Sequence, residues 1–293
     1  MIFIDLMNRS YVTGITLLIV VFSLFGFIPP YSPLGQKEGR INVVVTILPQ
    51  AEFVEKIGGD KVSVTVMIPA GYSPHAYEPS PAQLMMISTA DVYFMLGSGL
   101  EFELAWMDRI RKLNRDMMIV NCSEGIQTVG GNPHVWLSPS NAKIMLRNIY
   151  NALVELDGKN REFYARNLEA YMEELDELDM EIRSLFKKVT GRRFLVYHPA
   201  WIYFAMEYNL TQIPIEREGK EPTPALMAAI VDQAKESNLK VIFVSPQFDK
   251  RKAEVIAEEI DGKVVIIDPL AKDYVNNLRF VAKKLVEALS ENG

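Results

Sequence analysis

The chain alternates between short runs rich in β-branched residues and longer stretches with apolar side chains three and four positions apart. Runs of the first kind predict strands, and the second spacing predicts amphipathic helices. The predicted strands cover residues 42–48, 62–68, 91–96, 117–121, 194–197, 211–215, 241–244 and 264–267. Because these strands are short, apolar and separated by helices, they indicate parallel sheets covered on both faces.

Residues 161–189 predict one long helix, with apolar positions from Phe163 to Leu185 and an acidic remainder that is typical of a solvated face. At 1.5 Å per residue this helix would extend for about 40 Å, enough to run along two lobes. Roughly four strands stand on each side of it, so we expect an α/β protein of two lobes. The predicted divisions are a signal peptide or membrane anchor with its tether (1–40), an N-terminal lobe (41–157), a linker helix (158–190) and a C-terminal lobe (191–293).

The N-terminal segment is apolar and uncharged over residues 12–28. This run is long for the core of a signal peptide, short for a spanning helix, and without a polar face. We interpret it as an export signal or an uncleaved membrane anchor, with residues 29–40 as a tether; a buried core helix is the weaker alternative. Asp5 is unusual in such a signal, so Met7 is a better-placed start than Met1. The rest of the chain is expected outside the cytoplasm, in the periplasm or at the cell surface.

Composition narrows the possible partners. The formal net charge is −6, which argues against nucleic acid because phosphate backbones require a basic footprint. Apolar residues make up 49% of the chain, enough for a sizeable core. Cys122 is the only cysteine, which excludes an intramolecular disulfide and a thiolate metal cluster and leaves no cysteine near the apolar run to carry a lipid. We expect Cys122 to be packed in the core.

The chain has only three histidines, and each follows a predicted strand and stands beside proline. They are His75, His134 and His198. Asp268 ends the last predicted strand and also precedes a proline. In open parallel sheets, ligands bind outside the carboxyl ends of the strands, so these four side chains can meet if two sheets face one another across a cleft. Three imidazoles and a carboxylate form a four-ligand set for zinc, with bonds of about 2.0–2.2 Å. We therefore predict one metal site in that cleft.

Each of these residues also has a simpler interpretation. A single histidine after a strand is often a hydrogen-bonded loop residue, and Asp268 alone would suit a helix N-cap. Glu78 either accepts a hydrogen bond that orients His75 or stabilises the first turn of the next helix. Trp136 and Trp201 are expected to line the site or to pack in the core. It is the joint pattern of strand-end ligands that favours a metal site.

Six short motifs carry a family resemblance. They are HAYEPSP (75–81), NPHVWLSP (132–139), HPAWIYFA (198–205), GKEPTP (219–224), IFVSPQF (242–248) and DPL (268–270). Through them the chain from residue 42 onward resembles the zinc- and manganese-type solute-binding proteins of ABC transporters. The resemblance implies two α/β lobes bridged by one long helix, with an ion held in the cleft by His75, His134, His198 and Asp268. The third ligand is sometimes a glutamate in such proteins, which goes with manganese, so His198 favours zinc.

The chain departs from the family pattern in three places. Asn132 and Ser138 stand where aspartates are usual, and Ser245 stands where glutamate is common. Residues 125–132 contain no histidine, whereas many zinc members have a histidine-rich loop. These departures leave the four ligands intact, but they reduce the negative charge nearby and remove one indication of zinc.

The expected function is high-affinity capture of a divalent transition metal outside the cytoplasm, zinc favoured and manganese the alternative, and delivery to an ABC transporter permease. We expect a monomer that is not an enzyme. A surface adhesin or structural metal-binding protein is one alternative. A zinc hydrolase, with Glu78 or Glu216 as general base, is another. The hydrolase is disfavoured because four protein ligands leave no open position for water and because no His-Glu-x-x-His element occurs.

Overall fold

The computed structural model describes residues 39–216 and 223–291. The chain separates into the units Met1–Gly39 and Arg40–Gly293, and the account below concerns the second unit. The predicted signal or anchor at residues 12–28 and the predicted start at Met7 lie outside the described residues. Within the described part of the chain, each helix is too short or too polar to cross a bilayer.

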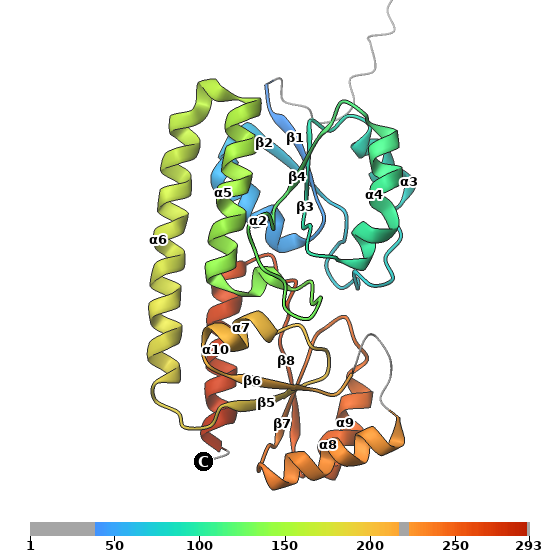
Figure 1. Ribbon diagram of the computed structural model, residues 1–293, viewed down its shortest axis with the longest axis vertical. Helices are drawn as coiled ribbons and strands as arrows, with labels where there is room; N and C mark the ends of the chain where they lie inside the picture. The colour runs from blue at the N-terminus through green and yellow to red at the C-terminus, as the bar shows by residue number, and fades with distance from the viewer. Residues whose placement is uncertain (1–38, 217–222, 292–293) are drawn as a thin grey trace, which may run out of the picture. The chain divides into compact units, whose positions relative to one another are not determined.

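Two four-stranded parallel sheets organise this unit (Figure 1). The strands of the first sheet lie in the order β2-β1-β3-β4, and those of the second in the order β6-β5-β7-β8. The first sheet comprises β1 (Ile41–Val45), β2 (Val62–Val66), β3 (Val92–Met95) and β4 (Met118–Asn121). The second comprises β5 (Arg193–Val196), β6 (Thr211–Pro214), β7 (Val241–Val244) and β8 (Lys263–Ile266). The predicted α/β class, with four parallel strands in each half, is confirmed.

Helices connect the strands, as parallel pairing requires. Those of the first half are α2 (Leu48–Gly58), α3 (Pro81–Ile87), α4 (Glu101–Leu113) and α5 (Pro139–Leu156), and those of the second are α7 (Ile202–Glu207), α8 (Pro224–Glu236), α9 (Lys250–Glu259) and α10 (Tyr274–Glu291). The one-turn helices η1 (Gly59–Lys61), η2 (Val135–Leu137) and η3 (Gly158–Asn160) complete the described elements. Ser80 and Ser138 accept hydrogen bonds from the first turns of α3 and α5, and proline follows each of them in the first helical turn.

The predicted long helix is α6 (Arg161–Phe186), which has 26 residues. It packs against α2, α5 and α10, and in Figure 1 it runs beside both sheets. Its buried positions include Tyr171, Leu175, Leu178 and Ile182, at the predicted spacing, whereas the predicted Phe163 is only partly buried and its neighbour Tyr164 is buried instead. The helix ends three residues before the predicted end at residue 189, ahead of Gly191. We call the first sheet with α2–α5 the N-terminal lobe, and the second sheet with α7–α9 the C-terminal lobe.

The hydrophobic core is shared between the lobes. One cluster of buried side chains is formed by β1 and β3, by the helices α5, α6 and α10, and by one face of the second sheet. Successive side chains of β5 point to opposite faces of the second sheet. Phe194 and Val196 join the shared cluster, whereas Leu195 belongs to a second cluster formed with α8 and α9. The two lobes are therefore joined by continuous apolar packing as well as by the linker helix.

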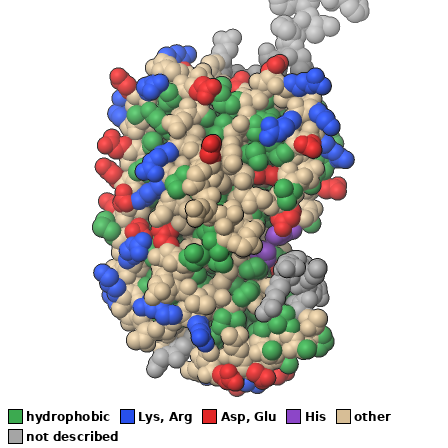
Figure 2. Space-filling view, viewed as in Figure 1, with side chains coloured by type: hydrophobic (Ala, Val, Ile, Leu, Met, Phe, Trp, Pro, Cys, Tyr) green, Lys and Arg blue, Asp and Glu red, His purple; other side chains and the backbone are tan. Residues whose placement is uncertain are grey.

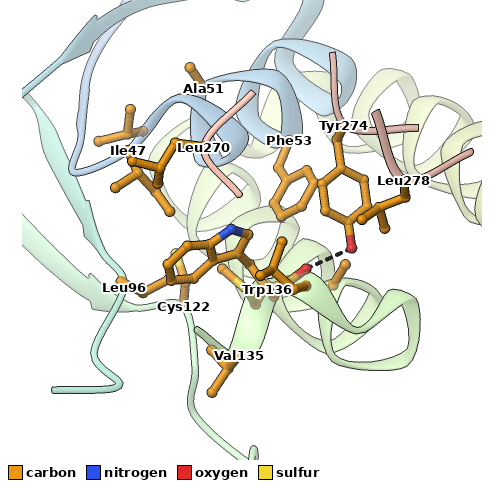
Figure 3. Close-up of a cluster of buried hydrophobic side chains, with 14 of the residues drawn as sticks. Ile47, Ala51, Phe53, Leu96, Cys122, Val135, Trp136, Leu270, Tyr274 and Leu278 are labelled. Carbon is orange, nitrogen blue, oxygen red and sulfur yellow. Dashed lines mark hydrogen bonds between the residues drawn. The ribbon is translucent and has the colours of Figure 1, made fainter. Parts of the chain in front are cut away.

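Hydrogen bonds reinforce this packing where the chain leaves β8, and Figure 3 shows the one between Tyr274 and Trp136. The indole Nε1 of Trp136 donates to the carbonyl oxygen of Pro269 at 2.7 Å, and the hydroxyl of Tyr274 donates to the carbonyl oxygen of Trp136 at 2.6 Å. The backbone N–H of Tyr274 donates to the buried carboxylate of Glu52 in α2 at 2.7 Å. These bonds fasten residues 269–274, which follow the second sheet, to the N-terminal lobe. We call residues 268–274 the strap.

Candidate metal centre

The three histidines come from loops at the carboxyl ends of strands. His75 lies between β2 and α3, His134 lies between β4 and η2, and His198 follows β5 after one residue, Tyr197. These edges of the two sheets face one another, and histidine side chains appear in the notch between the lobes in Figure 2. His134 and His198 are each 6% exposed, whereas the side chain of His75 is 28% exposed. The prediction that strand ends from both lobes bring the histidines together is therefore met.

The Nε2 atoms of the three imidazoles converge. The Nε2 of His198 lies 3.3 Å from that of His134 and 3.4 Å from that of His75. Two nitrogens that bind one tetrahedral zinc at about 2.0–2.1 Å lie about 3.3–3.4 Å apart, so both spacings match edges of such a coordination polyhedron. Among the described residues, these histidines form the one group of three or more metal-ligating side chains whose ligand atoms lie within 4.8 Å of one another.

Each imidazole is held from its other nitrogen. The Nδ1–H of His75 donates to Glu101 at 3.0 Å, that of His134 to the side-chain oxygen of Asn132 at 2.8 Å, and that of His198 to Glu216 at 3.2 Å. All three partner atoms are acceptors, so each Nδ1 carries the hydrogen and each Nε2 presents its lone pair to the common centre. Such outer partners fix the tautomer and the ring orientation of metal-binding histidines.

Helix α4 delivers Glu101 to His75. Glu101 is the first residue of α4, directly after the loop that follows β3. Two residues later, the buried Glu103 accepts hydrogen bonds from the backbone N–H groups of Leu96 and Gly97 and from the hydroxyl of Thr46. These bonds fasten the start of α4 to the end of β3, which sets the position of Glu101.

Burial and partner charges set the protonation of the histidines. Burial, together with the two neighbouring imidazoles, lowers the pKa of His134 well below its usual value, so this ring stays neutral and able to bind a metal. The hydrogen bond to Glu101 raises the pKa of His75, and the same bond lowers the pKa of Glu101. Neutral imidazoles with free lone pairs, backed by carboxylates, form a site with affinity for a soft or borderline cation.

Asp268 stands apart from this cluster. It lies just after β8, at the start of the strap, and its Oδ1 accepts from the side-chain amide of Gln247 at 3.0 Å and from the backbone N–H of Leu270 at 2.9 Å. Its carboxylate is not part of the group of described residues, the three histidines, whose ligand atoms lie within 4.8 Å of one another. The residues around the histidines form a small pocket, lined by Ser73, Pro74, His75, His134, Trp136, His198, Gln247, Phe248, Pro269 and Leu270.

Several contacts of the site were not predicted from the sequence. The acceptor for His75 is Glu101 and not Glu78, which is exposed and precedes the Ser80 cap of α3. Glu216, considered only as a general base, lies behind the ring of His198. Phe248 stacks on the same ring at 4.8 Å between centroids. Trp136 lines the site, and Trp201 and Cys122 are buried in the core, as predicted.

Comparison with known proteins places this geometry in a family. The sequence model of the family described as zinc-uptake complex component A, periplasmic, matches residues 43–288. The high-affinity zinc uptake system protein ZnuA of Bacillus subtilis is 32% identical over 257 residues, which cover 80% of each chain.

Solved structures agree in fold. A ZnuA deletion mutant with zinc bound superposes with a TM-score of 0.83 at 41% identity, covering 86% of this chain and 98% of that one. The laminin-binding protein of Streptococcus agalactiae, described as a bifunctional adhesin and metal transporter, gives a TM-score of 0.78 at 28% identity, covering 85% and 99%. The chain therefore belongs to the family of periplasmic zinc-uptake component A proteins.

Proposed function

We propose that this protein captures Zn²⁺ outside the cytoplasm and delivers it to the membrane permease of an ABC transporter. The observation that carries the proposal is the convergence of three Nε2 lone pairs, at 3.3 and 3.4 Å, in a pocket between two lobes. Two lone pairs facing each other at these distances repel unless a cation lies between them. Membership of a zinc-uptake family supports transport as the purpose of the binding.

We propose His75, His134, His198 and Asp268 as the ligands. Asp268 is compatible with this role because its Oδ1 is held by Gln247 and Leu270, which leaves Oδ2 to approach the ion. A ligating carboxylate is commonly hydrogen-bonded through its other oxygen in this way. Its approach would bring the fourth ligand from the strap and complete a closed tetrahedral site.

Zinc is the proposed cargo because three of the four ligands are imidazoles. Imidazole suits zinc, whereas manganese prefers sites with more oxygen ligands. The outer partners Glu101 and Glu216 add two carboxylates behind the histidines. This charge favours a divalent cation without adding oxygen atoms to the first coordination sphere.

Metal analysis and competition test this proposal. The purified chain from residue 40 onward would be stripped of metal, and its affinities for Zn²⁺ and Mn²⁺ measured by competition with chelators. We expect one equivalent of zinc to bind, and to bind more tightly than manganese. A matched variant, His134→Ala, should lose this site, whereas the exposed change Lys159→Ala should not. Equal affinity of wild type and His134→Ala would contradict the proposal.

Transport needs its own experiment. Deletion of the encoding gene should slow growth under zinc limitation, and added zinc should restore it. An adhesin role is the second candidate, because the laminin-binding relative is described as both adhesin and metal transporter. Normal growth of the deletion strain in depleted medium, with loss of surface attachment, would favour that role. We further propose that the protein acts as a monomer held near the membrane by residues 12–28, and that it is not an enzyme.

A further inference from the structure

Asn132 forms hydrogen bonds on both sides of its amide. Its side-chain oxygen accepts from the backbone N–H of His134 at 3.0 Å and from the Nδ1–H of the same residue at 2.8 Å. Its side-chain nitrogen donates to the carbonyl oxygen of Pro199 at 2.8 Å. Because the oxygen faces two donors and the nitrogen faces an acceptor, the orientation of the amide is determined by its surroundings.

The two sides of this amide touch the two lobes. His134 belongs to the segment between β4 and η2 in the N-terminal lobe, whereas Pro199 directly follows His198 at the end of β5 in the C-terminal lobe. One side chain therefore links the backbones that carry two of the three histidines. An aspartate could replace only half of this link, because a carboxylate accepts hydrogen bonds and has none to donate.

A second contact fixes the backbone of Asn132 against the C-terminal lobe. The hydroxyl of Tyr203 in α7 donates to the carbonyl oxygen of Asn132 at 2.7 Å and accepts from the backbone N–H of Val129 at 3.0 Å. The Gly-rich segment before His134 is thus held at both its side chain and its backbone.

The imidazoles of His134 and His198 need such a link before any ion is present. When both rings are neutral and carry their hydrogens on Nδ1, their Nε2 lone pairs point toward each other at 3.3 Å, which is repulsive without a metal ion or a proton between them. Both rings are buried, so water does not screen the repulsion well. The shared core joins the lobes at a distance from the site, so a contact beside the rings is needed to hold these two backbones at this spacing.

On these contacts, we infer that Asn132 is a positioning residue that holds His134 and His198 at metal-binding distance across the two lobes in the metal-free protein. The inference rests on the proposed function for its purpose, since the two histidines are its proposed ligands. An arriving ion then meets a preassembled pair, and less ordering entropy opposes binding. His75 already lies beside this pair, with its Nε2 3.4 Å from that of His198, and Asp268 remains to complete the site.

The decisive experiment measures the distance between the lobes in metal-free protein. Spin labels on Met85→Cys in α3 and Val255→Cys in α9 report this distance, because both positions are exposed and the native Cys122 is buried. In the otherwise wild-type protein we expect one narrow distance distribution, little changed by zinc. In Asn132→Asp, which keeps the acceptor but loses the donor, we expect a longer or broader distribution that zinc restores.

Zinc affinity supplies the second measurement. Asn132→Ala loses both sides of the link, and its affinity should fall by about 10- to 100-fold, the range typical of outer partners of metal-binding histidines. Tyr164→Phe removes a hydroxyl that donates to Asp157 between α5 and α6, outside the link, so it should lower the melting temperature but leave zinc affinity and the label distance unchanged. A purely structural Asn132 would show the same pattern as Tyr164→Phe.

Two results would overturn the inference. One is an Asn132→Asp protein, folded by circular dichroism, whose metal-free distance distribution matches that of wild type. The other is an Asn132→Ala protein with wild-type zinc affinity. Failure of the proposed function is distinguishable, because wild-type protein would then bind no zinc, whereas the metal-free label distances still report whether Asn132 links the lobes.

Discussion

The two halves of the candidate site differ in how they are held. His134 and His198 are each 6% exposed, and their backbones are linked across the lobes through Asn132. His75 lies on a longer loop with its side chain 28% exposed, and Asp268 lies apart from the histidine cluster, hydrogen-bonded to Gln247. The difference indicates a buried inner half and an outer half that is more open to water, although the Nε2 of His75 already lies 3.4 Å from that of His198.

Removing one inner ligand should have the largest effect. We expect His134→Ala or His198→Ala to lower zinc affinity by more than the roughly 100-fold that loss of an outer partner can cause. His75→Ala should cost less, because water can reach the outer side and take the vacant position on the ion. Chelator competition on the three folded variants measures the order. Equal losses for all three would remove the distinction between the halves.

Zinc should stabilise the whole unit through the site. An ion that binds only the folded state adds about 2.7 kcal/mol to the unfolding free energy at 100 times its dissociation constant. Denaturant unfolding with and without zinc measures this gain. The gain should be almost absent in His198→Ala and partly retained in His75→Ala. A full gain in His198→Ala would mean that zinc binds elsewhere.

Asp268→Asn tests the outer carboxylate. An amide of the same shape keeps one hydrogen-bond acceptor but removes the charge, and we expect about tenfold weaker zinc binding, or about 1.4 kcal/mol. Asp261→Asn is the matched control, because Asp261 is exposed in the same lobe and has a positive φ that asparagine tolerates. Unchanged affinity in Asp268→Asn would leave the three histidines as the only protein ligands.

Acidification should change the free energy of unfolding in opposite directions through the two halves of the site. The folded-state pKa of His134 is depressed, so below about 6.5 the unfolded chain binds a proton that the folded protein does not, and stability falls. The folded-state pKa of His75 is raised, so its contribution is present below about 6.5 and is lost as the pH rises through the raised value.

Denaturant unfolding of metal-free variants between pH 7.5 and 5 separates these effects. His134→Asn should lose less stability on acidification than wild type. Glu101→Gln removes the charge that raises the pKa of His75, and it should lose more. Parallel pH profiles for the two variants would show that the halves do not differ in this respect.

The elements of this fold could be predicted because their signals are local. The β-branched runs of β1 and β7, and the proline after Ser138, act within a few residues, and all eight strands appear where they were expected. The convergence of the histidines was also predictable, since the carboxyl ends of parallel strands share one edge of a sheet. That rule alone was enough to predict the convergence of His75, His134 and His198.

The outer partners could not be predicted because they come from elements distant in sequence. Glu101 reaches His75 from the start of α4, and Glu216 reaches His198 from beyond β6, positions that depend on how helices pack against sheets. Glu78 was the nearer candidate in sequence, but the turn before α3 leaves it exposed. The sharing of one core by both lobes also depends on α10, which returns from the end of the chain to pack against α6.

That shared core constrains how an ion can leave. Swinging the lobes widely apart would uncover side chains of α6 and α10, at a cost of about 25 cal/mol for each Å² of apolar surface exposed. Wide separation is therefore disfavoured, whereas small changes of spacing beside the site are not. We therefore expect the exit of the cargo to begin with small displacements of His75 and its loop, on the more exposed side of the site.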